Sequence, residues 1–98
     1  GIDIQASRGA SVHAAKDGTV VFRGRIPKLG NVVAVEHAYG IVTIYGHLSR
    51  TEVNCRDQVR RGEIIGYAGR SGSSNRPVLH FRIYTGYRAT RNPLDLLP

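Results

Sequence analysis

Methionine and tryptophan are absent from this 98-residue sequence, and cysteine occurs once, as Cys55. A single thiol excludes an internal disulfide and a zinc knuckle built from several thiolates, which leaves a free thiol or a bridge to a cysteine outside this segment. No apolar run approaches the roughly 18 residues that a membrane helix needs. The lack of an initiating methionine predicts a piece of a longer or processed protein, whose targeting signal would lie upstream.

Acidic residues are also scarce. Seven Asp and Glu oppose fourteen Lys and Arg, which gives a formal net charge of +7 with neutral histidine. This balance favours polyanionic partners such as an anionic cell-wall polymer, although a solvated surface tuned for solubility explains it as readily. Basic and aromatic residues are not interleaved as they are in ribonucleoprotein motifs, so the sequence does not favour nucleic acid.

The chain is long enough for one hydrophobic core, which predicts a single domain over residues 1–98. Short β-rich runs alternate with glycine turns, and no long amphipathic helix is indicated. This pattern is typical of an all-β, antiparallel, sandwich-like domain. The main strands are expected at residues 19–22, 31–37, 41–47 and 78–84, the second and third as a hairpin, and 48–54 has room for one helical turn.

The strand expected at residues 78–84 carries His80 and Arg82 on its less apolar face, by simple alternation. Taken alone, such a histidine is as readily a hydrogen-bonded structural residue as a functional one. Asp3 and His47 favour the functional interpretation, because each could bring a metal ligand or a proton-transfer group to the same sheet face.

Alternation also puts Tyr45 on the face of His47. This predicts that Tyr45, His47 and Arg82 line a groove that would hold a peptide or a partner. His13 and His37 lie apart from these motifs and are interpreted as structural.

Seven segments, in their order and spacing, resemble one protein family. They are Gly-Ile-Asp-Ile at 1–4, Ala-Ala-Lys-Asp-Gly-Thr-Val-Val at 14–21, Gly-Asn-Val-Val-Ala-Val-Glu-His at 30–37, Thr-Ile-Tyr-Gly-His-Leu-Ser at 43–49, Val-Arg-Arg-Gly-Glu-Ile-Ile-Gly at 59–66, Leu-His-Phe at 79–81 and Asn-Pro-Leu at 92–94. Over almost its whole length the chain resembles the lysostaphin-type (LytM-like) zinc metallopeptidase domain. The resemblance implies a β-fold of the barrel-sandwich hybrid kind and action on the peptide cross-links of bacterial cell walls.

The resemblance also implies a zinc ion held by a His-x-x-x-Asp motif and by the second histidine of a His-x-His strand. Asp3 matches the aspartate ligand and His80 the last histidine ligand. His47 matches a histidine beside the metal that helps to bind or polarise the scissile peptide. The third ligand would lie four residues before Asp3, upstream of Gly1. Three protein ligands leave one open position, where zinc-bound water becomes hydroxide near neutral pH.

Val78 departs from the family pattern, because it stands where the first histidine of His-x-His acts as a general base or transition-state donor. Residues 78 and 80 lie about 7 Å apart on one face of a strand, so a histidine at 78 would reach the zinc-bound water. Valine moves no proton, and loss of a general base costs roughly a hundred- to ten-thousand-fold in rate. The pattern resembles degenerate members that act as murein-hydrolase activators in cell division.

The favoured interpretation is therefore a degenerate domain, not itself an enzyme, that binds and activates a peptidoglycan amidase and lacks zinc if the upstream ligand is missing. The alternative is an active zinc endopeptidase whose upstream histidine is present and whose missing base is replaced, for instance by His47. The resemblance implies an exported protein of the periplasm or cell envelope in either event. A remote alternative, a biotinyl or lipoyl carrier domain modified on Lys16, lacks the flanking methionines and does not explain His47 or His80.

Overall fold

The computed structural model describes residues 2–5, 7, 9–69 and 78–87, with the backbone alone for 2–5 and 78. The strands of the described part are β1 (Ile2–Gln5), β2 (Ser11–His13), β3 (Gly18–Ile26), β4 (Gly30–Glu36), β5 (Val42–Thr51), β6 (Gln58–Val59), β7 (Ile64–Ala68) and β8 (Val78–Tyr84), and a 3-10 helix, η1 (Ala38–Gly40), joins β4 to β5. Among the described residues no helix is long and apolar enough to cross a membrane.

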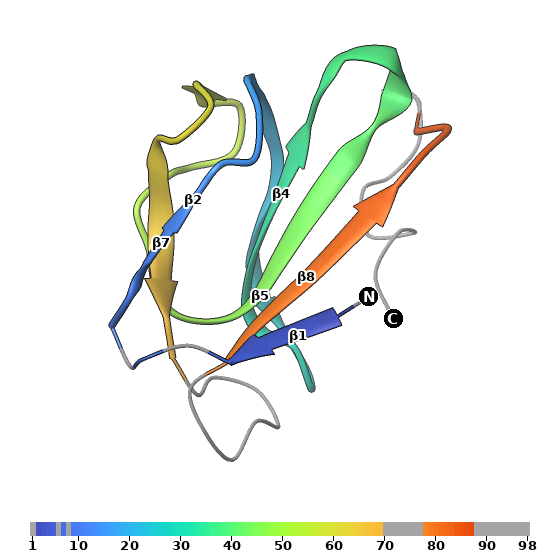
Figure 1. Cartoon of the computed structure of the whole chain (residues 1–98). Helices are drawn as coiled ribbons and strands as arrows, with labels where there is room; N and C mark the ends of the chain where they lie inside the picture. Colours follow the sequence, from blue (N-terminus) through green and yellow to red (C-terminus); the bar gives the residue numbers. More distant parts are fainter. Residues whose placement is uncertain (1, 6, 8, 70–77, 88–98) are drawn as a thin grey trace.

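All strand pairs are antiparallel, and the main sheet has the order β1-β8-β5-β4-β3-β6. β7 leaves this path, because it pairs with the far part of β5 and with β2. Figure 1 shows β2 and β7 side by side, as an arm that stands apart from β8 and β1. The sheet therefore curls back on itself, which confirms the antiparallel, sandwich-like β-fold expected from the sequence.

The central strand β4 is buried on both faces. Val33 and Val35 belong to one hydrophobic cluster, and Val32 and Ala34 to a second cluster on the other face. A strand covered on both faces reads as a continuous apolar run instead of an alternating one, as the sequence of β4 does. The two clusters fix the sheet register, because a slip by one residue would exchange their side chains.

A hydrogen-bonded chain ties the turn after β2 to the sheet. The Asp17 carbonyl oxygen can only accept a hydrogen bond, so His37 Nδ1 carries a proton and donates to this oxygen over 2.8 Å. His37 Nε2 then accepts from Thr43 Oγ1 (2.7 Å), which accepts from the Tyr45 hydroxyl (2.7 Å), which in turn accepts from the Ala15 amide (3.0 Å). Burial raises the pKa of Tyr45, which keeps this phenol protonated as the chain requires. These bonds fit the structural interpretation of His37.

The helical turn proposed within residues 48–54 is wrong. β5 continues as a strand to Thr51, because its second half pairs with β7, from Leu48 opposite Ala68 to Thr51 opposite Gly66. The polar composition of this segment reflects an exposed strand end and not a helix.

β5 also contains an irregularity at His47. Between the pairs Val33–Tyr45 and Asn31–Leu48, two steps along β4 face three steps along β5. The extra residue makes a β-bulge, and His47 has the left-handed backbone conformation (φ 59°), which is uncommon outside glycine. The Leu29 carbonyl accepts from the His47 amide (2.7 Å), and the His47 carbonyl accepts from the Gly69 amide (3.1 Å). These two bonds hold the bulge.

Candidate functional site

Two of the histidines that the sequence singled out meet in the structure. The ring centres of His47 and His80 lie 5.9 Å apart, and the ring planes are inclined by 77°. His47 is 7% exposed, and the Nε2 atom of His80 is buried. The expected convergence of these two imidazoles from β5 and β8 is confirmed.

The bulge and a glycine bring the two rings together. Gly46 lies directly opposite His80 in the β5–β8 ladder. A Cβ atom on Gly46 would come within 3.3 Å of the His80 Cβ, so glycine leaves room for the imidazole. The bulge then turns His47 toward the side of the sheet that Gly46 and His80 share.

Tyr45 lies on the other side of the sheet. Its β8 partner in the ladder is Phe81, and the two rings meet edge-on with their centres 5.4 Å apart. Alternation along β8 puts Phe81 and His80 on opposite faces of the sheet. The expectation that Tyr45 and His47 share a face is therefore wrong, because it assumed an unbroken strand and the bulge intervenes.

Tyr45 is 1% exposed and belongs to the first hydrophobic cluster. The structure thus places it in the core and not beside His47 and His80. Arg82 is placed differently, since it pairs with Ile44 and keeps the face of His80. Its guanidinium carbon lies 5.3 Å from the ring centre of Tyr84, which is a cation–π contact. The positive charge therefore lies toward Tyr84, two residues further along β8.

Asp3 is brought to the same place by the pairing of β1 with β8. The register sets Asp3 opposite His80 and Gln5 opposite Val78, so the two ends of the described chain meet here. Residues directly opposite one another in antiparallel strands are near enough to act on one ligand. The side chains of Asp3 and Val78 lie outside the described part.

The donor set fits part of a zinc site. Asp3 and His80 would supply two ligands, whereas a zinc site takes three or four from the protein. Among the described residues, no group of three or more His, Cys, Asp and Glu side chains could hold a metal ion. Without a metal, the paired imidazoles and the nearby Arg82 can still hydrogen-bond a carbonyl or carboxylate group.

Sequence reasoning missed Gly46 and the bulge beside it. A glycine inside a β-rich run is a known signal for a bulge or a close approach. The pair Gly46-His47 carries that signal, and it would have broken the assumed alternation at the right place.

Comparison with known proteins agrees with this geometry. The family model of peptidase family M23 matches residues 1–94. The chain belongs to peptidase family M23. The resemblance to lysostaphin-type domains is thereby confirmed, and the carrier-domain alternative at Lys16 loses its support.

Among curated relatives, the M23 domain is 44% identical to the cell division protein DipM of Caulobacter vibrioides, over 85% of this chain and 14% of that protein. It is 40% identical to the murein hydrolase activator EnvC of Escherichia coli, over 85% of this chain and 20% of that protein. The chain therefore spans only a fifth or less of these two relatives.

Solved structures share the fold. The catalytic domain of the antimicrobial peptidase lysostaphin from Staphylococcus simulans has a TM-score of 0.84 at 30% identity, over 99% of this chain and 77% of the other. A zinc-containing peptidase from Vibrio cholerae has a TM-score of 0.79 at 34% identity, over 83% of this chain and 25% of the other.

Proposed function

We propose that this M23 domain acts in bacterial cell-wall remodelling by binding and activating a peptidoglycan amidase, without cutting the wall itself. Val78 carries the proposal. It lies two residues before His80 on β8, in the first position of the His-x-His pattern. Because valine neither accepts nor donates a proton, the step that needs a general base at this position has no group to perform it.

Two of the relatives support this class of function. EnvC is a murein hydrolase activator and DipM a cell division protein, and both are at least 40% identical to the domain. Murein lies outside the cytoplasmic membrane, so the proposal includes an exported protein of the periplasm or cell envelope. The partner would be a cell-wall amidase or peptidoglycan itself.

The contact surface that we propose is centred on the partly exposed Arg82 and lies next to His47, which is buried, and His80, whose Nε2 atom is buried. The imidazoles can form hydrogen bonds with the backbone of a partner segment, and the Arg82 guanidinium can bind a carboxylate of that segment. Strand β1 completes the edge beside them, and an extended partner segment would fit such an edge. The same groups that bind a substrate in a peptidase would then bind a partner.

Zinc belongs to the second candidate, an active zinc endopeptidase. The register of Asp3 opposite His80, with the His47 ring centre 5.9 Å from that of His80, favours it. Asp3 and His80 would hold the ion, which when bound polarises a carbonyl and acidifies water. His47 would then move the proton that a histidine at position 78 would otherwise move.

A reconstituted assay separates the two candidates. The full-length protein that contains this chain would be incubated with dye-labelled peptidoglycan, with and without a cognate amidase and added zinc. We expect no dye release by the protein alone. The protein and the amidase together should release dye faster than the amidase alone. Chelator-sensitive cleavage by the protein alone would instead establish the endopeptidase.

Matched variants test the surface. His47→Ala and Arg82→Ala should lower activation of the amidase severalfold while the domain stays folded. His13→Gln is the control, because His13 is an exposed histidine on β2 that bonds the Gly62 carbonyl over 2.8 Å. Equal loss of activation in all three variants would reject the proposed surface.

A further inference from the structure

A hollow of about 390 Å³ lies where β3 and β5 end and β4 begins. Its lining residues are Arg23, Gly24, Arg25, Asn31, Arg50 and Thr51. Half of them are arginines and none is acidic. We call Arg23, Arg25 and Arg50 with this hollow the arginine pocket. It shares no residue with the histidine site.

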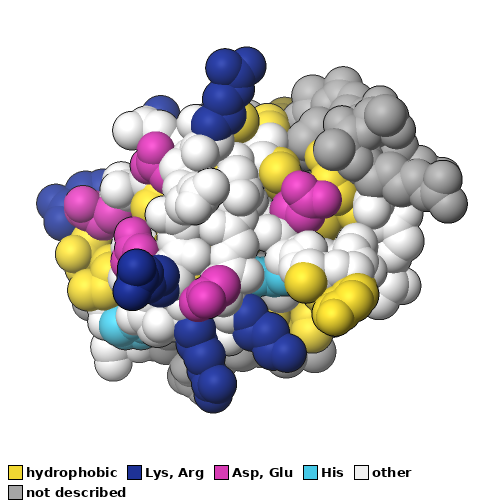
Figure 2. Space-filling view, turned by 90° about the horizontal axis from the view of Figure 1, so that it is seen from above, with side chains coloured by type: hydrophobic (Ala, Val, Ile, Leu, Met, Phe, Trp, Pro, Cys, Tyr) yellow, Lys and Arg dark blue, Asp and Glu magenta, His cyan; other side chains and the backbone are white. Residues whose placement is uncertain are grey.

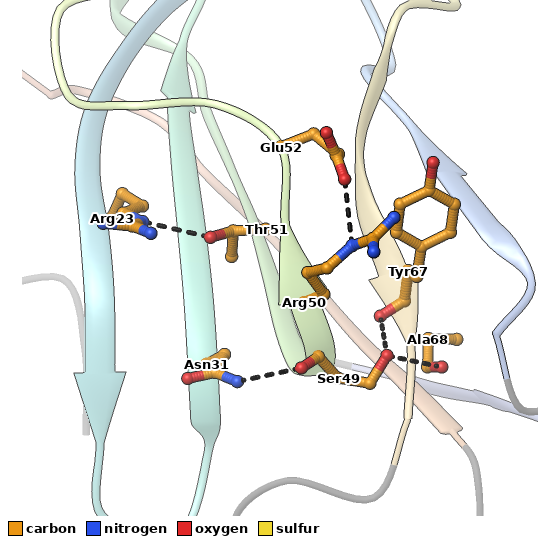
Figure 3. A network of polar contacts seen from close by, with 8 residues as sticks. All are labelled: Arg23, Asn31, Ser49, Arg50, Thr51, Glu52, Tyr67 and Ala68. Atoms are coloured by element: carbon orange, nitrogen blue, oxygen red, sulfur yellow. Dashed lines mark hydrogen bonds and ion pairs between the residues drawn. The ribbon is translucent and has the colours of Figure 1, made fainter.

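The sheet register creates the arginine pocket. Arg25 pairs with Asn31 across the β3–β4 ladder, and Arg23 shares the face of Arg25 because it lies two residues earlier. Arg23 Nε donates to Thr51 Oγ1 over 3.0 Å, which spans β4, since β4 lies between β3 and β5. Figure 3 shows this bond. Two strands, β3 and β5, thus contribute cations to one hollow, and β4 between them contributes Asn31.

Two of the guanidinium groups are held in place. Arg50 Nε pairs with Glu52 Oε1 at 3.0 Å, and the Arg50 guanidinium carbon lies 4.6 Å from the ring centre of Tyr67 (Figure 3). Arg23 is likewise held through Nε. When a guanidinium is bound through Nε, its two terminal nitrogens can still bind a ligand. Their N–H groups form a fork that matches a carboxylate or phosphate. Restricted side chains also lose less entropy when a ligand binds.

The charge distribution at the pocket differs from that on the face drawn in Figure 2. On the face seen in Figure 2, Lys and Arg side chains alternate with Asp and Glu. In the arginine pocket three cations line one hollow, and Glu52 pairs with one of them. Glu52 offsets one of the three charges, so the arginine pocket keeps a net positive charge.

We propose that the arginine pocket binds an oxyanion, a phosphate or carboxylate group carried by an anionic cell-wall polymer. Bound there, the polymer would hold the domain on the wall independently of the histidine site. Each of the two groups presents a pair of oxygens that can accept two parallel N–H bonds from a guanidinium fork. The proposal does not depend on amidase activation.

Isothermal titration calorimetry of the full-length protein that contains this chain, at low salt, tests the site with two probes, pyrophosphate and citrate. We expect saturable binding that weakens as salt rises, and the tighter probe identifies the group recognised. Arg23→Gln/Arg25→Gln should weaken binding about tenfold or more, because charge-assisted hydrogen bonds are lost. Arg23→Lys/Arg25→Lys should give a smaller loss, because the charge stays and the fork goes.

Arg60→Gln/Arg61→Gln is the charge-matched control. These two exposed arginines use their backbone amides for their bonds to Glu63 and Asp17, so the substitution leaves those bonds in place. Unchanged binding in this control supports the site. Equal loss in both double variants would show a response to net charge only and would overturn the proposal, as would the absence of saturable binding of either probe.

Discussion

At the scale of single residues, Tyr39 does not suit its backbone. It is 97% exposed and has the left-handed conformation (φ 64°), next to Gly40 (φ 70°) in η1. A left-handed backbone costs most residues roughly 1–2 kcal/mol, whereas asparagine adopts it more readily. Because the side chain is almost fully exposed, packing does not offset this cost, and Tyr39 contributes little to the core.

We therefore expect Tyr39→Asn to raise the free energy of unfolding by roughly 0.5–1 kcal/mol. Urea denaturation followed by circular dichroism measures the change. Tyr39→Ala is the control, because alanine removes the same ring and keeps the strained conformation. A loss of stability in the asparagine variant, or an equal gain in both, would contradict the explanation.

Some of the residue-scale chemistry could be predicted from the sequence and some could not. His47 and His80 were singled out from their motifs, and the structure brings them together. The bonds from His37 to Asp17 and Thr43 depend on a turn folding onto the sheet. No local pattern specifies such a contact, so only the general role of His37 could be inferred.

At the scale of elements, alternation and glycine turns predicted the strands but not their ends. β5 is longer than expected because β7 extends its pairing, and its bulge follows from the shifted register against β4. The longer pairing depends on β7, which is distant along the chain, and the bulge depends on the exact register between β4 and β5, which alternation does not specify. The face that Tyr45 takes could therefore not be predicted by counting residues from His47.

A substitution at Gly46 tests the close approach of β5 to β8 beside the bulge. A Cβ at this position would lie 3.3 Å from the His80 Cβ and 3.6 Å from the Leu29 carbonyl. We expect Gly46→Ala to destabilise the domain by roughly 1–3 kcal/mol, as overpacking does, and to shift the imidazole NMR signals of His47 and His80. The same substitution in a His80→Gly background should cost less, because the opposing Cβ is gone. Equal costs in the two backgrounds would exclude the contact.

At the scale of the whole molecule, the two ends of the described chain meet at the site, where β1 pairs with β8. A metal bound there would link folding to zinc, because it would join strands that are far apart in sequence. The zinc content of the protein therefore reports on the completeness of the site as well as on its chemistry.

A protein with no histidine four residues before Asp3 should purify with little or no zinc when no metal is added. Asp3 and His80 then supply two ligands, and a stable zinc site takes at least three. Elemental analysis measures the content, and about one zinc per chain would favour the endopeptidase. Introducing histidine at that upstream position together with Val78→His should raise both the zinc content and the cleavage of peptidoglycan. If the double variant gains zinc but no cleavage, positions other than these two also disable the site, because the ligands and the general base would then both be present.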